Sequence, residues 1–218
     1  DGEPMESERH VIQPQLLKDP LKLYWQGRNF YIGINMFVYF SQKRIKNQDF
    51  RGPDYFIALD VDPRERKSWV VWQEEKGPDL VIEFFSETTM DTDKNLKKEI
   101  YQDKLKVQEY YWFDPFTKEL AGFHLVNGKY QQITPNAKGQ LNSEKTGLAL
   151  VKWQGIYEDI EAVWLRWASL EGELLPTKAE HLLLERNKLA FEKEQESQRA
   201  NKLAQRLKDL GVNPEDIS

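Results

Sequence analysis

Residues 77–115 constrain the fold of this chain more than any other stretch. Residues 80–85 form an almost wholly apolar run after a Gly-Pro pair, which is typical of a strand buried on both faces. Residues 94–104 then place apolar side chains at helical spacing, and the aromatic run 109–113 is again strand-like. Strand, helix and strand at these lengths predict a βαβ unit with two parallel strands, and hence an α/β fold.

A single charge, Glu83, interrupts the first of these strands. A carboxylate inside a buried strand is costly unless it is paired with a cation or binds a metal. The strand alone therefore leaves two interpretations open for Glu83. One is a buried ion pair with a lysine or arginine, and the other is a metal ligand.

Asp54 stands at the start of another predicted buried strand, residues 55–61. If the two strands are neighbours, Asp54 and Glu83 approach within the spacing of adjacent strands, about 4.8 Å. Carboxylates that close repel unless a cation lies between them, and an all-oxygen site suits Mg²⁺ or Mn²⁺. Asp79 lies roughly 13 Å along the strand from Glu83, so we interpret it as a strand-start or supporting residue.

Lys97 lies on the predicted helix that follows the Glu83 strand, from which its side chain can reach back over the strand end. An ammonium group there could orient a metal-bound water and stabilise a phosphate in the transition state. The alternative is a solvated lysine on the helix surface, because Lys94 and Lys98 lie close by. The residues alone leave both readings open.

Composition limits the class of protein. The 218 residues are 39% apolar, which suffices for one core and an appendage. The absence of cysteine excludes disulfides and thiolate zinc sites and favours a reducing cytoplasm. No signal peptide is visible and no apolar run reaches the roughly 18 residues of a membrane span, so we expect a cytoplasmic protein without a membrane partner. The net charge of −5 argues against tight, non-specific nucleic-acid binding but allows an enzyme that touches DNA locally.

Local signals predict several further elements. Two short helical pieces are expected within residues 9–25, separated by a bend because two prolines interrupt the pattern. One or two strands are expected within residues 29–40, with Gly33 as a bulge. Asn127-Gly128 between two apolar runs predicts a β-hairpin, and residues 156–167 are expected to form a short helix.

The composition changes near residue 176. Residues 177–210 contain neither glycine nor proline, Thr177 and Glu180 form a capping-box pattern, and Gly211 is a natural helix C-cap. A broken heptad pattern, apolar at both ends and charged in the middle, predicts a long exposed helix that pairs with a second copy or docks elsewhere. We therefore expect a domain over residues 1–175 and a helical tail over residues 176–218, a possible coiled coil.

Several of these segments occur together in a known family. The segments are Pro53-Asp54, residues 78–86, Asp93 and Lys97 before Tyr101, residues 109–112, and Asp114-Pro115. As a set, and over about residues 1–170, they resemble the Uma2 family, which belongs to the PD-(D/E)XK or restriction-endonuclease-like superfamily. The resemblance implies a restriction-endonuclease-like fold: a mixed β-sheet of about five strands flanked by helices, here with a long C-terminal helix.

The resemblance also assigns roles. Asp54 matches the motif aspartate and Glu83 the (D/E) position, so both would hold Mg²⁺ or Mn²⁺. The superfamily lysine should stand two residues after Glu83, where this chain has Phe85, and Lys97 from the following helix is the residue that would replace it. Asp54, Glu83 and Lys97 are thus the implied catalytic residues.

The implied activity is metal-dependent hydrolysis of DNA phosphodiester bonds by an endonuclease. The carbonyl of Phe84 is a candidate additional ligand, and Glu6 or Glu8 is a candidate upstream acidic residue. A homodimer is implied because many nucleases of the superfamily pair to cut both strands. The alternative is a catalytically silent nuclease-like protein that binds DNA or acts as a scaffold through its C-terminal helix.

Overall fold

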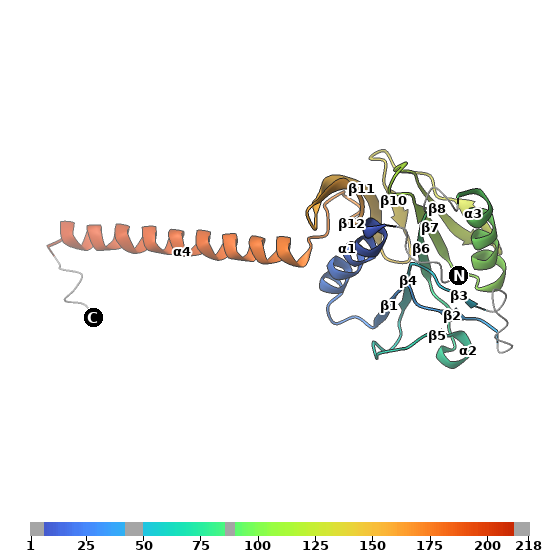
Figure 1. Cartoon of the computed structure of the whole chain (residues 1–218). Coiled ribbons are helices and arrows are strands. Elements are labelled where there is room, and N and C mark those ends of the chain that lie inside the picture. The colour runs from blue at the N-terminus through green and yellow to red at the C-terminus, as the bar shows by residue number, and fades with distance from the viewer. Residues whose placement is uncertain (1–6, 42–49, 86–89, 212–218) are drawn as a thin grey trace. The chain divides into compact units, whose positions relative to one another are not determined.

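A computed structural model describes residues 7–41, 50–85 and 90–211, without the side chains of residues 90–94. The chain divides into two compact units, residues 1–175 and residues 176–218. Six strands of the first unit form one mixed sheet in the order β1-β4-β6-β7-β8-β9 (Figure 1). Helices and two smaller sheets flank it, so the predicted α/β class with a mixed sheet and a long C-terminal helix is confirmed.

The centre of the sheet is the predicted βαβ unit. Strand β6 (Leu80–Phe84) runs parallel to β7 (Glu109–Phe113), and β4 (Tyr55–Leu59) pairs with the other edge of β6 in antiparallel fashion. The connection between β6 and β7 contains α3 (Met90–Glu99) and a π-helical turn, η1 (Ile100–Lys104). A π-turn is a local widening of a helix that is frequent at functional sites.

The outer strands are β1 (Phe30–Ile34), β8 (Leu120–Val126) and β9 (Lys129–Gln132). Asn127 and Gly128 join β8 to β9 with φ angles of 50° and 79°, which confirms the predicted hairpin and its turn chemistry. Gly33 pairs in regular register with Phe56 on β4 and forms no bulge. A Cβ at Gly33 would lie 2.0 Å from the Phe56 ring, so close packing explains the glycine.

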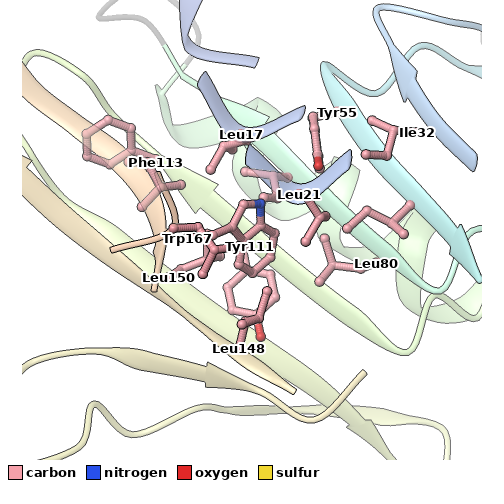
Figure 2. Packing of buried hydrophobic residues seen from close by; sticks show 14 of the residues in the cluster. Leu17, Leu21, Ile32, Tyr55, Leu80, Tyr111, Phe113, Leu148, Leu150 and Trp167 are labelled. Carbon is pink, nitrogen blue, oxygen red and sulfur yellow. The ribbon is translucent and has the colours of Figure 1, made fainter. Parts of the chain in front are cut away.

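One face of the large sheet is covered by α1 (Glu8–Tyr24) and by a second sheet. That sheet consists of β10 (Leu141–Ser143), β11 (Leu148–Tyr157) and β12 (Ile160–Ala168). Figure 2 shows the main core between these layers, where leucines of α1 surround Trp167 and Tyr111. The buried amide of Gln13 exchanges two 2.8 Å hydrogen bonds with the backbone of Leu165, which fixes α1 to β12.

The opposite face of the large sheet is covered by α3, η1 and a small sheet in the order β3-β2-β5. Its strands are β2 (Val38–Tyr39), β3 (Phe50–Arg51) and β5 (Trp69–Val70), and the short helix α2 (Val71–Glu74) follows β5. A second apolar cluster fills this layer; it includes Val38, Phe56, Trp69, Val81, Tyr101, Leu105 and Tyr110. The central strands are therefore buried on both faces, as the apolar run 80–85 predicts.

Two predicted elements were wrong. Helix α1 continues through Pro14 and Pro20 without a break, because both prolines lie on its buried face, where packing offsets their missing hydrogen bonds. Residues 156–167 form most of strand β12 and the end of β11 rather than a helix. Glu158 and Asp159 make the connecting turn with positive φ angles of 47° and 62°, a conformation that Asn-Gly more often signals.

The second unit contains α4 (Lys178–Asp209). Its predicted capping box is confirmed: the Glu180 backbone N–H donates to the Thr177 hydroxyl, and the Thr177 N–H donates to the Glu180 carboxylate. Gly211 follows the helix with a φ of 77° and donates its N–H to the Lys208 carbonyl, as expected for a C-cap. In the described part of the chain, no helix combines the length and the apolar character needed to cross a membrane.

Candidate active site

The pairing of β4 with β6 brings Asp54 and Glu83 to the same end of the sheet. The register pairs Tyr55 with Ile82, so Asp54, one residue before β4, stands opposite Glu83. Side chains alternate between faces along a strand, and Val81 belongs to the cluster beneath α3 and η1. Glu83, two residues further on, therefore points towards α3 and η1 rather than into the main core.

Glu83 is completely buried and makes two polar contacts with the helical connection. Lys97 of α3 places its Nζ 3.0 Å from Glu83 Oε2, and the Tyr101 hydroxyl in η1 donates to Oε1 at 2.5 Å. Lys97 and Tyr101 are four residues apart, so they share one face of the helix. The structure thus brings Glu83 and Lys97 together and adds Tyr101 to them.

Burial raises the pKa of Glu83 to about 7, because a charged carboxylate loses its hydration inside the protein. The ammonium of Lys97 lowers this pKa, the nearby charge of Asp54 raises it, and the Tyr101 hydrogen bond lowers it. Burial and the same carboxylate also raise the pKa of Tyr101 well above its usual value, so the phenol stays a donor. Glu83 is consequently poised to change charge near neutral pH.

Asp54 and Asp79 make equivalent contacts at opposite ends of the β4–β6 pair. Asp54 Oδ2 accepts a 2.7 Å hydrogen bond from the Phe84 backbone N–H, and Asp79 Oδ2 accepts one of the same length from the Leu59 N–H. Asp79 also pairs with Lys76 at 2.8 Å. Each aspartate precedes one strand and fastens the end of the other. The contacts of Asp79 agree with its interpretation as a strand-start residue. Asp54 makes the same kind of contact but also stands beside Glu83.

Phe85 occupies the position where the superfamily pattern has a lysine. Its ring packs against Trp112 with the ring centroids 5.9 Å apart, and the Lys97 ammonium lies 5.7 Å from the Phe85 ring centroid. The Lys97 ammonium therefore lies near the position where the superfamily pattern has its lysine. The Lys97 side chain is 18% exposed, whereas the Glu83 side chain is completely buried.

Of the two upstream acidic candidates, the structure describes only Glu8. Glu6 lies outside the described residues, and Glu8 is exposed in the first turn of α1. Buried His10 reaches the end of β6 instead: its Nε2 lies 3.3 Å from the Phe85 carbonyl oxygen, and its Nδ1 lies 2.8 Å from the Ser7 hydroxyl. The histidine joins α1 to the strand that carries Glu83.

Tyr101 and His10 are the residues that the sequence prediction missed. Tyr101 could have been found, because a residue four positions after Lys97 on a helix must point the same way. His10 carried no comparable signal, since nothing in the sequence places the first turn of α1 against the end of β6. Asp93, part of the matched pattern, belongs to the portion of α3 whose side chains are outside the description.

The donor set fits a hard divalent cation. Asp54 and Glu83 supply carboxylate oxygens close enough for the charge of Asp54 to raise the Glu83 pKa, a repulsion that a cation between them would relieve. Within residues 7–41, 50–85 and 90–211, excluding the side chains of residues 90–94, no cluster of three or more histidine, aspartate or glutamate side chains could hold a metal. Two carboxylates are compatible with Mg²⁺, which usually retains several waters.

Comparisons with known proteins identify a matching family and a similar solved structure. A family model named Uma2 and described as "Putative restriction endonuclease" matches residues 2–153. A crystal structure from Anabaena variabilis ATCC 29413, described as a "putative nuclease belonging to DUF820", is 17% identical to this chain, with a TM-score of 0.45. The alignment covers 66% of this chain and 76% of that one. No curated protein matches the sequence.

Proposed function

The chain belongs to the Uma2 family, and on that premise we propose that it is a divalent-metal-dependent endonuclease that hydrolyses DNA phosphodiester bonds. Asp54 and Glu83 would hold Mg²⁺ or Mn²⁺, and Asp54, Glu83 and Lys97 would be the catalytic residues. The family match supports a nuclease-like protein; the metal, the substrate and the roles of these residues are the proposal.

One observation carries the proposal: a fully buried glutamate contacts a lysine at 3.0 Å and stands opposite an aspartate whose charge raises its pKa. A simple buried ion pair would need only the lysine. The neighbouring aspartate adds a second negative charge, which makes ionisation of Glu83 more costly. A fully buried carboxyl with a raised pKa, beside a second carboxylate and a lysine, is the kind of cluster that often marks a functional site, and this supports binding.

Each residue has a distinct task in the proposed reaction. A divalent ion held by Asp54 and Glu83 would supply a bound water of lowered pKa and positive charge next to the phosphate. Lys97, which is partly exposed, would meet the phosphate and offset charge that develops on its oxygens. Tyr101 keeps the proton on its hydroxyl. The hydroxyl donates a hydrogen bond to Glu83 Oε1, which orients the carboxylate.

The test combines calorimetric titration with Mn²⁺ and a plasmid-nicking assay with Mg²⁺. The parent should bind the ion and nick DNA, while Glu83→Gln and Asp54→Asn should lose at least about 100-fold in nicking, the size expected when a group that stabilises the transition state is removed. Asp79→Asn is the matched control for Asp54→Asn, because Asp79 makes the same 2.7 Å contact at the far end of the strands.

Lys97→Met has its own control in Lys98→Met. The Lys98 ammonium lies 3.6 Å from the Phe123 ring centroid instead of near Glu83, so its removal should leave nicking unchanged. Lys97→Met should abolish nicking yet keep Mn²⁺ binding. Equal metal response and equal nicking in parent, Glu83→Gln and Lys97→Met would contradict the proposal and favour the silent scaffold.

A further inference from the structure

Helix α4 presents an apolar seam to solvent. None of its 32 residues, all of which the structure describes, is buried. Leu182, Leu189 and Leu203 are 55%, 65% and 56% exposed. With Glu196 and with Leu210 at the C-cap they recur at seven-residue intervals. A companion row lies three positions before each of these five residues: Ala179, Arg186, Lys193, Ala200 and Leu207. Such a two-row seam is the contact surface of a coiled coil.

The charges in the middle of the seam discriminate between the two orientations of a pair. In a parallel pair each seam position faces its own copy, so Lys193 would meet Lys193, Glu196 would meet Glu196 and Arg186 would meet Arg186. In an antiparallel pair the rows face each other, and Lys193 meets Glu196 of the second copy twice. Like charges in the core are unfavourable and opposite charges are favourable, so the antiparallel arrangement is preferred.

The register that pairs Lys193 with Glu196 also matches the apolar residues. Its remaining seam pairs are Ala179 with Leu210, Leu182 with Leu207, Arg186 with Leu203, and Leu189 with Ala200. In three of these pairs a leucine faces an alanine or a flexible arginine, which favours interdigitation, and the fourth pairs two leucines. The register is centred within one residue of the middle of α4, so the two helices overlap along almost their full length.

The residues beside the seam agree with the same register. Along one flank, Glu185 and Glu192 lie in the first half of α4, and Arg199 and Arg206 lie in the second half. Antiparallel pairing sets Glu192 beside Arg199 of the second copy and Glu185 beside Arg206, and symmetry doubles each contact. The other flank is free of charge and consists of Leu183, Ala190, Ser197 and Ala204. A parallel pair would set the charged flank against the neutral one and gain nothing from it.

We propose that α4 of one chain pairs with α4 of a second copy as an antiparallel coiled coil in this register. The apolar seam, the central opposite charges and the complementary flank all select the same partner and the same direction. This inference is independent of the nuclease chemistry, because none of its residues lies in the first unit. At about 1.5 Å per residue, α4 is about 48 Å long, so the two points where α4 begins would lie about that far apart.

The first experiment measures the mass of the full chain in solution by sedimentation. The expected mass is about twice the monomer mass of 25.8 kDa. A double variant, Leu189→Asp with Leu203→Asp, should be monomeric. Leu184→Asp with Phe191→Asp is the matched control, because both residues are more than half exposed but lie on the face opposite the seam. A monomeric parent, or a seam variant that remains dimeric, would overturn the proposal.

The second experiment determines whether the two helices run antiparallel. The sequence contains no cysteine, so introduced cysteines would be the only ones able to form a disulfide. Under mild oxidation, Leu182→Cys with Leu207→Cys should form a disulfide between copies. Leu182→Cys alone should not, because antiparallel pairing holds its two copies about 38 Å apart. Glu192→Arg should weaken dimerisation, and Arg199→Glu in the same chain should restore it. Cross-linking of Leu182→Cys to itself would show a parallel pair and overturn the proposed orientation.

Discussion

Two glutamates on adjacent parallel strands are buried equally and surrounded differently. Glu83 on β6 is 0% exposed, and Glu109 on β7 is 2% exposed. Lys97 and Tyr101 hold Glu83, beside a second carboxylate. Glu109 accepts hydrogen bonds from the Ser143 and Tyr111 hydroxyls and from the Lys145 backbone N–H. Burial alone therefore does not mark a functional carboxylate.

The difference lies in what each set of partners achieves. The partners of Glu109 are neutral donors from β7 and from the β10–β11 region, so this carboxylate joins two sheets and has its oxygens satisfied. The surroundings of Glu83 include a neighbouring negative charge and a cation that remains partly open to solvent. We infer that Glu109 serves the fold and that Glu83 serves binding. Three substitutions test this contrast.

The largest change in the free energy of unfolding is expected for Glu83→Gln above neutral pH. Because the pKa of Glu83 rises from 4.5 to about 7 on folding, the folded state holds a proton that the unfolded state releases between these values. Glu83 stabilises the fold fully below its unfolded pKa, and this contribution is lost as pH rises through about 7. At pH 8 the variant should exceed the parent in free energy of unfolding by up to about 3 kcal/mol.

The measurement is urea denaturation of both proteins, without divalent ions, at pH 5 and pH 8. The difference between them should shrink at pH 5, where folded Glu83 is mostly protonated and resembles glutamine. A variant that is less stable than the parent at both pH values would show that the Lys97 pair supports the fold, and the contrast with Glu109 would fail.

Glu109→Gln should change the free energy of unfolding in the opposite direction from Glu83→Gln, and by a smaller amount. The amide NH₂ replaces an oxygen that accepts from Ser143 and Tyr111 or from the Lys145 N–H, so at least one buried donor loses its partner. The expected loss in free energy of unfolding is about 2 kcal/mol, measured by urea denaturation at pH 7. Glu144→Gln, at an exposed neighbouring position, is the control and should change stability little.

Tyr101→Phe should have the smallest effect of the three substitutions, and it tests whether the surroundings of Glu83 set the pKa of its carboxyl. The phenol donates to Glu83 Oε1 and lowers the pKa of the carboxyl, so its removal should raise that pKa above about 7. Carbon-13 NMR titration of labelled glutamate side chains measures the shift, with Glu83→Gln identifying the signal. The acid limb of the nicking activity should move to higher pH in parallel. An unchanged titration would remove Tyr101 from the site.

Residues 77–115 show what the sequence could predict. The strand, the helix and the second strand followed from a short apolar run, one embedded charge and the turn signals around them. The adjacency of Asp54 to Glu83 depended on the two strands being neighbours, which the pairing of β4 with β6 shows. Local pattern sufficed because the two strands are almost wholly buried and the helix between them keeps one periodicity. The π-turn was not predictable, since nothing in the residues Ile100 to Lys104 distinguishes it from a regular helix.

The errors lie where packing overrides local preference. Pro14 and Pro20 would end a solvent-exposed helix, but the face that they occupy in α1 is buried. A short helix was expected in residues 156–167, yet Trp164 and Trp167 in this segment lie on a strand whose partner β11 is ten residues long. The turn at Glu158 and Asp159 lacks the glycine that would have signalled that hairpin.

The reciprocal contacts of Asp54 and Asp79 have a consequence for how the sheet assembles. If β4 slid past β6 by one residue, both aspartates would lose the backbone N–H groups that they hold. A one-residue change in pairing also turns side chains to the opposite face of a sheet. Asp54 would then no longer stand opposite Glu83. The two contacts therefore favour the single alignment of β4 with β6 in which Asp54 stands beside Glu83.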